Sequence, residues 1–355
     1  MNKIISFPHI GSYYIPIKYL IKKITKCEVV IPKINNKETI VFGSKYSPTD
    51  ICMPFKYNLG DYIDAINKGA NTLIQAGGGC RYGYYAELQE KILRNLDYKF
   101  EFINLIKDNK ISFLKLYKIS KKINHKLNIM SYIYYLIQTF LIIIFMDKLN
   151  NYIRINQAKS SQPEEYKKVS KKINILYSNN KLSILKIIKI YLKLNKELKI
   201  IPIASNNPIK ILLIGELYTL MDNRANNDLE SLLMQNKTVI YRYTDLTYLL
   251  IKKRFMQRHI LNASRKYLKY TLGADGAESV YHSIKHCQEG IDGIIHIKSY
   301  GCVPELNAIP ILNQISEDYK VPIMYLSYDG ENNIANIDTK IEAFYDMIKS
   351  KKSKQ

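Results

Sequence analysis

The chain of 355 residues contains no tryptophan and has few cysteines and few acidic residues. Five cysteines are an odd and sparse set, which argues against the disulfide framework of a small secreted domain. The first eight residues lack an apolar core with a small-residue cleavage site, so no signal peptide is expected. These absences together indicate a reducing, cytoplasmic setting.

Acidic residues are scarce relative to basic ones: 53 Lys and Arg against 31 Asp and Glu give a formal charge of +22. Such an excess is typical of nucleic-acid binding. The basic residues are mostly lysines, however, and they accompany abundant Ile, Asn and Tyr, as an AT-rich genome would encode. A dedicated binder carries arginine clusters interleaved with aromatic residues. We therefore interpret the charge as a solvated basic surface and expect no nucleic-acid partner.

Residues 129–146 contain no charged side chain, and their number is close to that of a membrane span. Ser131, Gln138 and Thr139 nevertheless interrupt the run, and aromatic belts are missing at its two ends. This pattern favours a buried helix over a membrane contact.

Strands and helices alternate in two stretches of the chain, which predicts parallel sheets covered on both faces. In the first stretch we expect strands at 3–7, 28–32 and 71–75 and helices at 12–24, 61–67 and 84–95. In the second we expect strands at 210–215, 238–241, 293–297 and 321–326 and helices at 227–236, 279–287, 304–316 and 339–349. Between them, residues 98–198 lack glycine and have a helical period, which predicts a helical bridge.

The two α/β stretches share a pattern. A helix ends at Gly69, a strand follows, and Cys80 closes the loop eleven residues after the glycine. Likewise a helix ends at Gly290, and Cys302 follows it by twelve residues. Ligand sites in open α/β sheets lie at the carboxyl ends of the strands. We therefore expect each domain to present a cysteine there.

Cys52, Cys80 and Cys302 each precede a predicted helix, and Cys52-Met53-Pro54 matches Cys302-Val303-Pro304. A thiolate at a helix start meets unpaired N–H groups and the positive end of the helix dipole, which favour metal binding. Three such residues favour an iron–sulfur cluster with one iron not held by cysteine, over three unrelated core residues. Zinc is less favoured because Cys-x-x-Cys pairs are absent, and Cys27 and Cys287 are interpreted as packing residues.

Other candidate site residues lie beside these cysteines or after predicted strands. Gly78 and Gly79 suit a close backbone approach to a cluster or anion, although a flexible turn is the alternative. Lys56 and Arg81 provide either surface charge or positive charge for a developing anion. No Gly-x-Gly-x-x-Gly or Walker motif supports nucleotide binding.

Two further groups follow the first strand of each α/β stretch, and one follows the last strand. His9 and Glu216 are candidate acid or base groups, with loop residues as the alternative. The substrate-binding candidates at the same edges of the sheets are Gly11, Tyr218 and Asp329. His296 lies in an apolar strand and is expected to be a core histidine.

These residues resemble the 2-hydroxyacyl-CoA dehydratase D-component family, with its benzoyl-CoA reductase and double-cubane-cluster relatives. Within this superfamily, the acyl-CoA dehydratase activase-related group is the most similar. No single matching string is specific by itself, but the order of the strings along the chain is. Together they span most of the chain outside the helical bridge. The matching strings are residues 50–56, 79–85, 211–218, 292–296, 301–305 and 339–344.

The resemblance implies an α/β fold of two flavodoxin-like (Rossmann-like) open parallel-sheet domains joined by a helical bridge, with boundaries 1–97, 98–200 and 201–355. It implies a [4Fe–4S] cluster as the cofactor, held between the two domains by the cysteines. In the dehydratases an actin/Hsp70-fold ATPase activase injects one electron, which the cluster passes to a 2-hydroxyacyl-CoA, and a ketyl radical then loses water. An anaerobic electron-transfer protein acting on an acyl-CoA-like small molecule is therefore expected, as a lyase or an ATP-coupled reductase component.

The chain departs from the family in three ways. It has no second cysteine triad of the double-cubane type and no activase ATPase signature, and Lys340 stands where relatives often carry arginine. These departures leave an alternative open: a non-catalytic scaffold or regulatory partner of the activase. The substrate and the choice between homodimer and heterodimer also stay open.

Overall fold

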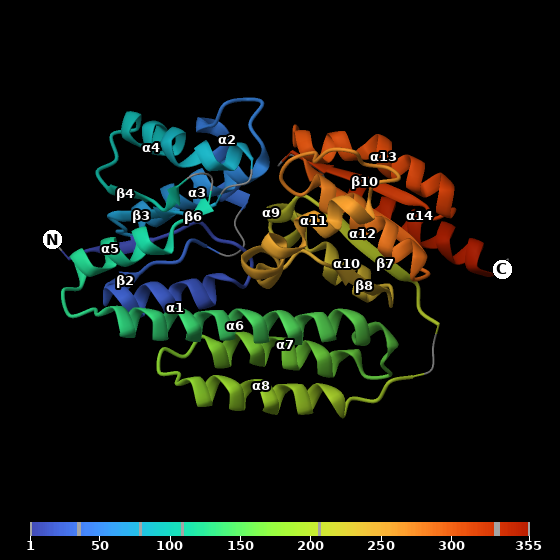
Figure 1. Cartoon of the computed structure of the whole chain (residues 1–355), viewed down its shortest axis with the longest axis horizontal. Helices are drawn as coiled ribbons and strands as arrows, with labels where there is room; N and C mark the ends of the chain where they lie inside the picture. The colour runs from blue at the N-terminus through green and yellow to red at the C-terminus, as the bar shows by residue number, and fades with distance from the viewer. Residues whose placement is uncertain are drawn as a thin grey trace. The chain divides into compact units, whose positions relative to one another are not determined.

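The computed structural model describes residues 2–33, 37–77, 80–107, 110–204, 207–329 and 334–353. The chain divides into two compact units. The first comprises residues 1–142 and 177–184, and the second comprises residues 143–176 and 185–355. Figure 1 shows one twisted sheet with flanking helices in each unit.

The first unit alternates strands and helices, as the sequence predicts, before it becomes helical. Its elements are β1 (Ile4–Ser6), α1 (Tyr14–Thr25), β2 (Glu28–Val29), α2 (Lys37–Tyr46), α3 (Met53–Asn67), β3 (Thr72–Gln75), the 3₁₀-helix η1 (Arg81–Tyr84), α4 (Tyr85–Asn95), β4 (Glu101–Asn104), the hairpin β5 (Ile106–Lys107) and β6 (Lys110–Ile111), α5 (Phe113–Ile123) and the first half of α6 (Ile129–Asn156).

The second unit begins with the rest of α6 and contains the second sheet. Its elements are the 3₁₀-helix η2 (Gln157–Lys159), α7 (Pro163–Tyr177), α8 (Ile184–Lys199), β7 (Lys210–Gly215), α9 (Leu217–Met221), α10 (Leu229–Gln235), β8 (Val239–Arg242), the π-helix η3 (Tyr248–Lys252), α11 (Lys253–Ala263), α12 (Gly276–Gln288), β9 (Gly293–Ser299), α13 (Val303–Tyr319), β10 (Ile323–Tyr328) and α14 (Ile334–Ser353).

The two four-stranded sheets have the same topology. The strand order is β2-β1-β3-β4 in the first and β8-β7-β9-β10 in the second, and every neighbouring pair is parallel. This 2-1-3-4 order is compatible with a flavodoxin-like sheet. The predicted α/β class with parallel sheets is therefore confirmed for both units.

A matching polar clamp at the amino edge of each sheet strengthens the likeness between the units. Asn71 donates its backbone N–H to the carbonyl of Ile4, and its side-chain oxygen accepts the N–H of Ile4 at 2.9 Å. Asp292 makes the same two bonds to Lys210, with the side-chain bond at 2.7 Å. Each clamp joins the residue before the third strand to the start of the first, and so sets the register of the central pair.

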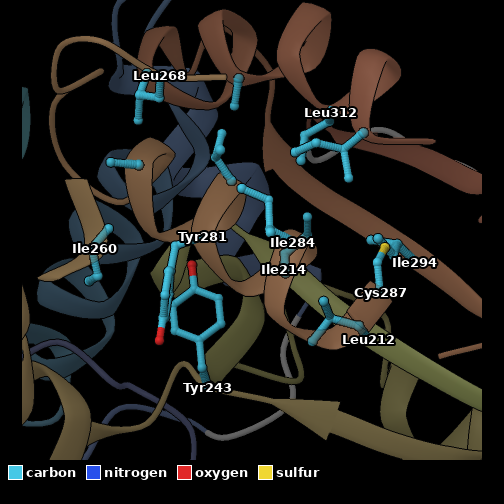
Figure 2. Close-up of a cluster of buried hydrophobic side chains, with 14 of the residues drawn as sticks. Leu212, Ile214, Tyr243, Ile260, Leu268, Tyr281, Ile284, Cys287, Ile294 and Leu312 are labelled. Carbon is cyan, nitrogen blue, oxygen red and sulfur yellow. The ribbon is translucent and has the colours of Figure 1, made fainter. Parts of the chain in front are cut away.

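The core of the second unit lies between its sheet and the helices α12 and α13. All seven residues of β9 are buried, as expected for the centre of a parallel sheet covered on both faces. Figure 2 shows Ile214, Ile284 and Leu312 in this core. Such packing excludes water and leaves the carboxyl ends of the strands as the place for polar side chains.

The helical segment begins later than the sequence analysis expected. Residues 101–104 form β4, which pairs with β3, and a short hairpin follows before α5 starts. Short strands of this kind carry no clear period, so only pairing with β3 identifies β4. From α5 to α8 the chain is helical, and these helices are divided between the two units.

The second half of α6 is anchored to the second unit by a buried carboxylate. Asp147 accepts hydrogen bonds from the backbone N–H of Thr247 at 2.9 Å and from the Thr247 hydroxyl at 2.5 Å. Near the end of the helix, Arg154 lies 3.7 Å from Glu230, which also pairs with Arg242. These contacts place the charged end of α6 against the loops and helices of the second sheet.

Candidate functional site

Cys52 is the N-cap of α3, which confirms its predicted position at a helix start. Its backbone is extended, its carbonyl accepts the N–H of Phe55 at 3.0 Å, and Pro54 occupies the first turn. The half-buried thiol contacts the hydroxyl of Tyr85 at the start of α4. The sulfur therefore has a polar neighbour that the sequence analysis did not identify.

Cys80 is exposed and begins the 3₁₀-helix η1. Its sulfur accepts the backbone N–H of Tyr82 at 3.4 Å. The ring of Tyr82 lies 4.9 Å from that of Tyr85, and the Tyr82 hydroxyl accepts a 2.7 Å bond from the buried Asn58 of α3. The tyrosine pair thus connects the surroundings of Cys80 with those of Cys52.

Cys302 is the N-cap of α13 and follows β9, again as predicted. Its carbonyl accepts the N–H of Leu306 at 2.9 Å, and Pro304 lies in the first turn. Lys298, near the end of β9, lies close enough for the two side chains to interact electrostatically. Burial lowers the pKa of the Lys298 ammonium, and the nearby Cys302 and Glu305 oppose that shift.

The start of α12 packs closely against the Cys302 loop. A Cβ on Gly276 would stand 2.6 Å from the carbonyl oxygen of Pro304, so only glycine fits there. The corresponding position in the first unit is the start of α3, which carries Cys52. Two helix starts therefore lie at the carboxyl edge of each sheet, with cysteine at both in the first unit and at one in the second.

The basic candidates of the first unit have different surroundings. Lys56 is half-buried in the first turn of α3, and its backbone lies under α2, because a Cβ on Gly43 would stand 1.8 Å from the Lys56 carbonyl. Arg81 is exposed in η1, next to Cys80. Gly78 and Gly79 lie outside the described residues, so their predicted approach to a ligand stays a prediction.

His9 is 2% exposed, so its predicted position at the ligand edge does not bring it to the surface. Its backbone N–H donates to the Asp61 carboxylate at 2.8 Å, and its ring stacks on Tyr14 with 5.2 Å between centroids. Gly11 follows in the turn before α1 with a φ of 44°, which favours glycine. The loop after β1 is therefore tied down by side-chain contacts.

Glu216 is the N-cap of α9, and its carboxylate accepts the N–H groups of Tyr218 at 2.9 Å and Thr219 at 3.0 Å. Burial raises the pKa of Glu216 to about 7; the bonds from Thr219 and Tyr218 oppose this shift, and nearby Asp275 adds to it. A general acid or base that works at neutral pH needs a pKa in this range. Tyr218 is buried, and its hydroxyl accepts a 3.3 Å bond from Arg224.

A charged cluster at the start of α12 was missed by the sequence analysis. Lys253 of α11 donates to Asp275 at 2.6 Å and lies 3.2 Å from Glu278. Burial disfavours the charge on Lys253, but the two carboxylates outweigh burial and raise its pKa. Two glycines and two acids within residues 273–278 are the signal that marks this helix start, but nothing in the sequence links it to Lys253, twenty residues earlier.

A buried polar network lies behind this cluster. Nε2 of His296 lies 2.8 Å from Oε2 of Glu305, which also accepts a 3.0 Å bond from the Ser279 hydroxyl. The Tyr243 hydroxyl lies 3.4 Å from Ser279, and its ring stacks on His282 with 3.9 Å between centroids. His296 is therefore a hydrogen-bonded core histidine, as predicted.

The two cysteines interpreted as packing residues occupy hydrophobic surroundings. Cys287 is buried among Leu212 and Ile294 (Figure 2), and burial raises the pKa of its thiol to about 12. Cys27 is half-buried beside the core of the first unit. Asp329 follows β10 and is half-buried at the carboxyl edge of the second sheet, as expected.

Among the residues that the structure describes, no three or more His, Cys, Asp or Glu side chains are grouped to hold a metal ion. Cys52 and Cys80 belong to the first unit and Cys302 to the second. None of the five cysteines, all of them in the described ranges, forms a disulfide. No protein-family model matches the chain, and no curated protein matches it.

Proposed function

We propose that this chain is an iron–sulfur redox protein of the 2-hydroxyacyl-CoA dehydratase type. The observation that carries the proposal is the placement of Cys52, Cys80 and Cys302 at helix starts, of which those at Cys80 and Cys302 follow the strands β3 and β9. Backbone N–H groups and the helix dipole stabilise anionic thiolates and the anionic cluster they would bind.

The chain has the number of cysteines that such a cluster needs, although no three of its ligating side chains are grouped among the described residues. Three thiols lie at helix starts, and at the fourth comparable place Gly273 and Asp275 occur instead of cysteine. A [4Fe–4S] cluster held by Cys52, Cys80 and Cys302 would therefore keep one iron open to another ligand. Since each unit alone has at most two of these cysteines, both units would have to contribute.

When bound, the cluster would supply one-electron chemistry at low potential. The residues of the chain would then bind and polarise the substrate. Arg81 and Lys56 would provide positive charge for the carbonyl of an acyl thioester. Glu216, with its pKa near 7, would hold or release a proton at the carboxyl edge of the second sheet.

The proposal includes an actin/Hsp70-fold ATPase as electron donor, an acyl-CoA-like substrate and a cytoplasmic setting. The absence of disulfides among the five cysteines is consistent with a reducing compartment. Within the part of the chain that the structure describes, one helical segment, α6 with η2 (Ile129–Lys159), is long and apolar enough to cross a membrane by length and composition alone.

Anaerobic iron and sulfide quantitation tests the proposal. The wild type, reconstituted without oxygen, is expected to bind about four irons and to show broad visible absorption. Cys52→Ala, Cys80→Ala and Cys302→Ala should each lower the iron content, whereas the matched controls Cys27→Ala and Cys287→Ala should retain it. A colourless wild type without iron, or equal iron in all five variants, would contradict the proposal.

A second candidate is a non-catalytic scaffold or regulatory partner of the activase. This candidate is favoured because both acid–base candidates already make structural contacts. His9 is buried and stacked on Tyr14, and Glu216 caps α9. In this case a cluster-containing protein would retain a partner ATPase in a pull-down, but acyl-CoA substrates would not oxidise its reduced form. Substrate-dependent oxidation would instead favour the enzyme.

A further inference from the structure

An exposed apolar stripe runs along the first half of α6. It consists of Ile129, Met130, Ile133, Tyr134 and Ile137, which recur at helical spacing on one face. Met130 is 74% exposed, and the other four are exposed by more than two fifths. Contiguous apolar surface of this kind marks an interaction site more often than scattered single residues do.

The opposite face of the same helix segment is held by the first unit. Tyr132, Gln138 and Thr139 are buried, and the amide of Gln138 donates to the carbonyl of Leu182 at 2.7 Å. Gln138 also accepts a 2.9 Å bond from the hydroxyl of Tyr19. Crossing a membrane would break these bonds and expose the amide to hydrocarbon, so the stripe suits a surface contact and not a span.

Lysines are frequent just before the stripe, and acids are missing from this part of the sequence. Residues 109–146 contain six lysines, one histidine and no Asp or Glu. Lys115, Lys118 and Lys122 lie at helical spacing on the exposed face of α5, where Leu114 is 73% exposed. The helix that precedes the stripe therefore has a basic outer face with an apolar residue at its edge.

Ring contacts show that α5 lies antiparallel beside α6. The rings of Tyr117 and Tyr132 are 5.1 Å apart and those of Phe113 and Phe140 are 5.9 Å apart, while the Tyr132 hydroxyl donates to the Phe113 carbonyl at 2.7 Å. Each helix buries the side opposite its exposed residues. The lysine face and the apolar stripe are consequently neighbours on the outside of the unit.

Two lysines at the end of α1 contact the face of α6 that is opposite the stripe. The ammonium groups of Lys23 and Lys26 lie 5.8 Å and 5.9 Å from the centre of the Tyr135 ring. Tyr135 packs against the core of the first unit, so these two lysines are not neighbours of the stripe.

We propose that the stripe and the exposed lysines of α5 form an attachment surface for an anionic lipid bilayer. Interfacial helices combine an apolar face that enters the headgroup region with lysines that attract anionic lipids, and both features are present here. A second copy of the chain is a poorer occupant, because the same lysines would face one another across a symmetric contact. The surface lies within one unit and does not depend on the proposed iron–sulfur function.

Flotation of the full-length protein with vesicles tests the proposal. Vesicles of phosphatidylcholine mixed with phosphatidylglycerol should carry the protein upward at low salt, and pure phosphatidylcholine vesicles should not. High salt should weaken binding, because it screens the lysines. Equal binding to both vesicle types would contradict the proposed preference for anionic lipid.

Variants separate the apolar and basic contributions. Met130→Ser, Ile133→Ser and Ile137→Ser should each weaken binding by about tenfold, because each removes apolar area from the bilayer contact. Lys115→Gln, Lys118→Gln and Lys122→Gln should each weaken it by about fivefold. Ile175→Ser and Leu185→Ser, which alter apolar residues outside the stripe that are about as exposed as Met130, should bind as the wild type does.

Three results would overturn the proposal even if vesicle binding is seen. One is equal loss of binding in the stripe variants and in the Ile175→Ser and Leu185→Ser controls. Another is resistance of the bound protein to alkaline carbonate, which would indicate a span. The third is concentration-dependent dimerisation that the stripe variants abolish while vesicle binding persists. Circular dichroism of every variant ensures that lost binding is not lost folding.

Discussion

The imidazole Nε2 of His296 lies 2.8 Å from the carboxyl Oε2 of Glu305, and both side chains are shielded from solvent. The pair joins the centre of β9 to the first turn of α13, the helix that Cys302 begins. It therefore fixes the start of that helix relative to the sheet.

Replacing Glu305 should destabilise the second unit strongly. Glu305→Ala leaves the Ser279 hydroxyl and the imidazole without their buried acceptor, which costs about 3–5 kcal/mol of unfolding free energy. Urea denaturation measures the loss, and Glu317→Ala on the exposed face of α13 is the control, expected within about 0.5 kcal/mol of wild type. Equal midpoints for the two variants would mean that the network contributes little.

Stability should depend on pH through Glu216. Its pKa is about 7 in the folded chain against an ordinary 4.5, so the folded state holds the proton more tightly. Glu216 consequently adds at most about 3 kcal/mol to the unfolding free energy below pH 4.5. This contribution is lost as the pH rises to about 7.

The comparison of urea midpoints at pH 5 and pH 8 measures this effect. In Glu216→Gln the unfolding free energy should fall less between pH 5 and pH 8 than in the wild type, because glutamine does not titrate. The difference should be most of the contribution of about 3 kcal/mol. An unchanged fall in the variant would assign the pH dependence to other groups.

Tyr85→Phe should lower the reduction potential of an iron–sulfur centre bound at Cys52. The hydroxyl of Tyr85 contacts the thiol sulfur, and a hydrogen bond to a ligand sulfur raises the reduction potential of an iron–sulfur centre. If the chain holds such a centre, loss of the hydroxyl should lower the potential by about 20–60 mV. A spectroscopic redox titration measures the shift, with Tyr84→Phe, which alters an exposed neighbour, as the unaffected control.

Two glycine substitutions should differ sharply in cost. A Cβ on Gly215 would stand 1.8 Å from the carbonyl oxygen of Ile297, and its φ is 125°. Gly290 has a φ of 77° but open space around it. Gly215→Ala is therefore expected to cost about 3–5 kcal/mol, from overpacking and backbone strain together, and Gly290→Ala about 1 kcal/mol. Thermal unfolding of both variants compares them, and similar melting temperatures would refute the close approach of β7 and β9 at Gly215.

Much of the local structure was predictable because it depends on neighbours in the chain. Apolar runs such as residues 210–215 predicted the central strands, and the Cys-x-Pro motifs predicted helix starts at Cys52 and Cys302. Gly69 and Gly290 end their helices with positive φ, as glycine after a helix commonly does. Short elements such as β4 were missed because a partner strand, and not their own pattern, defines them.

The sequence alone determined the α/β class, the parallel sheets and the three cysteines at helix starts, since periodicity and capping act over a few residues. Only the tertiary structure placed Tyr85 against Cys52, Lys253 against Asp275, and the stripe of α6 on the outside of its unit. These relationships join residues far apart in the chain or decide which face of a helix is covered. They follow from how many side chains pack at once, which no local pattern specifies.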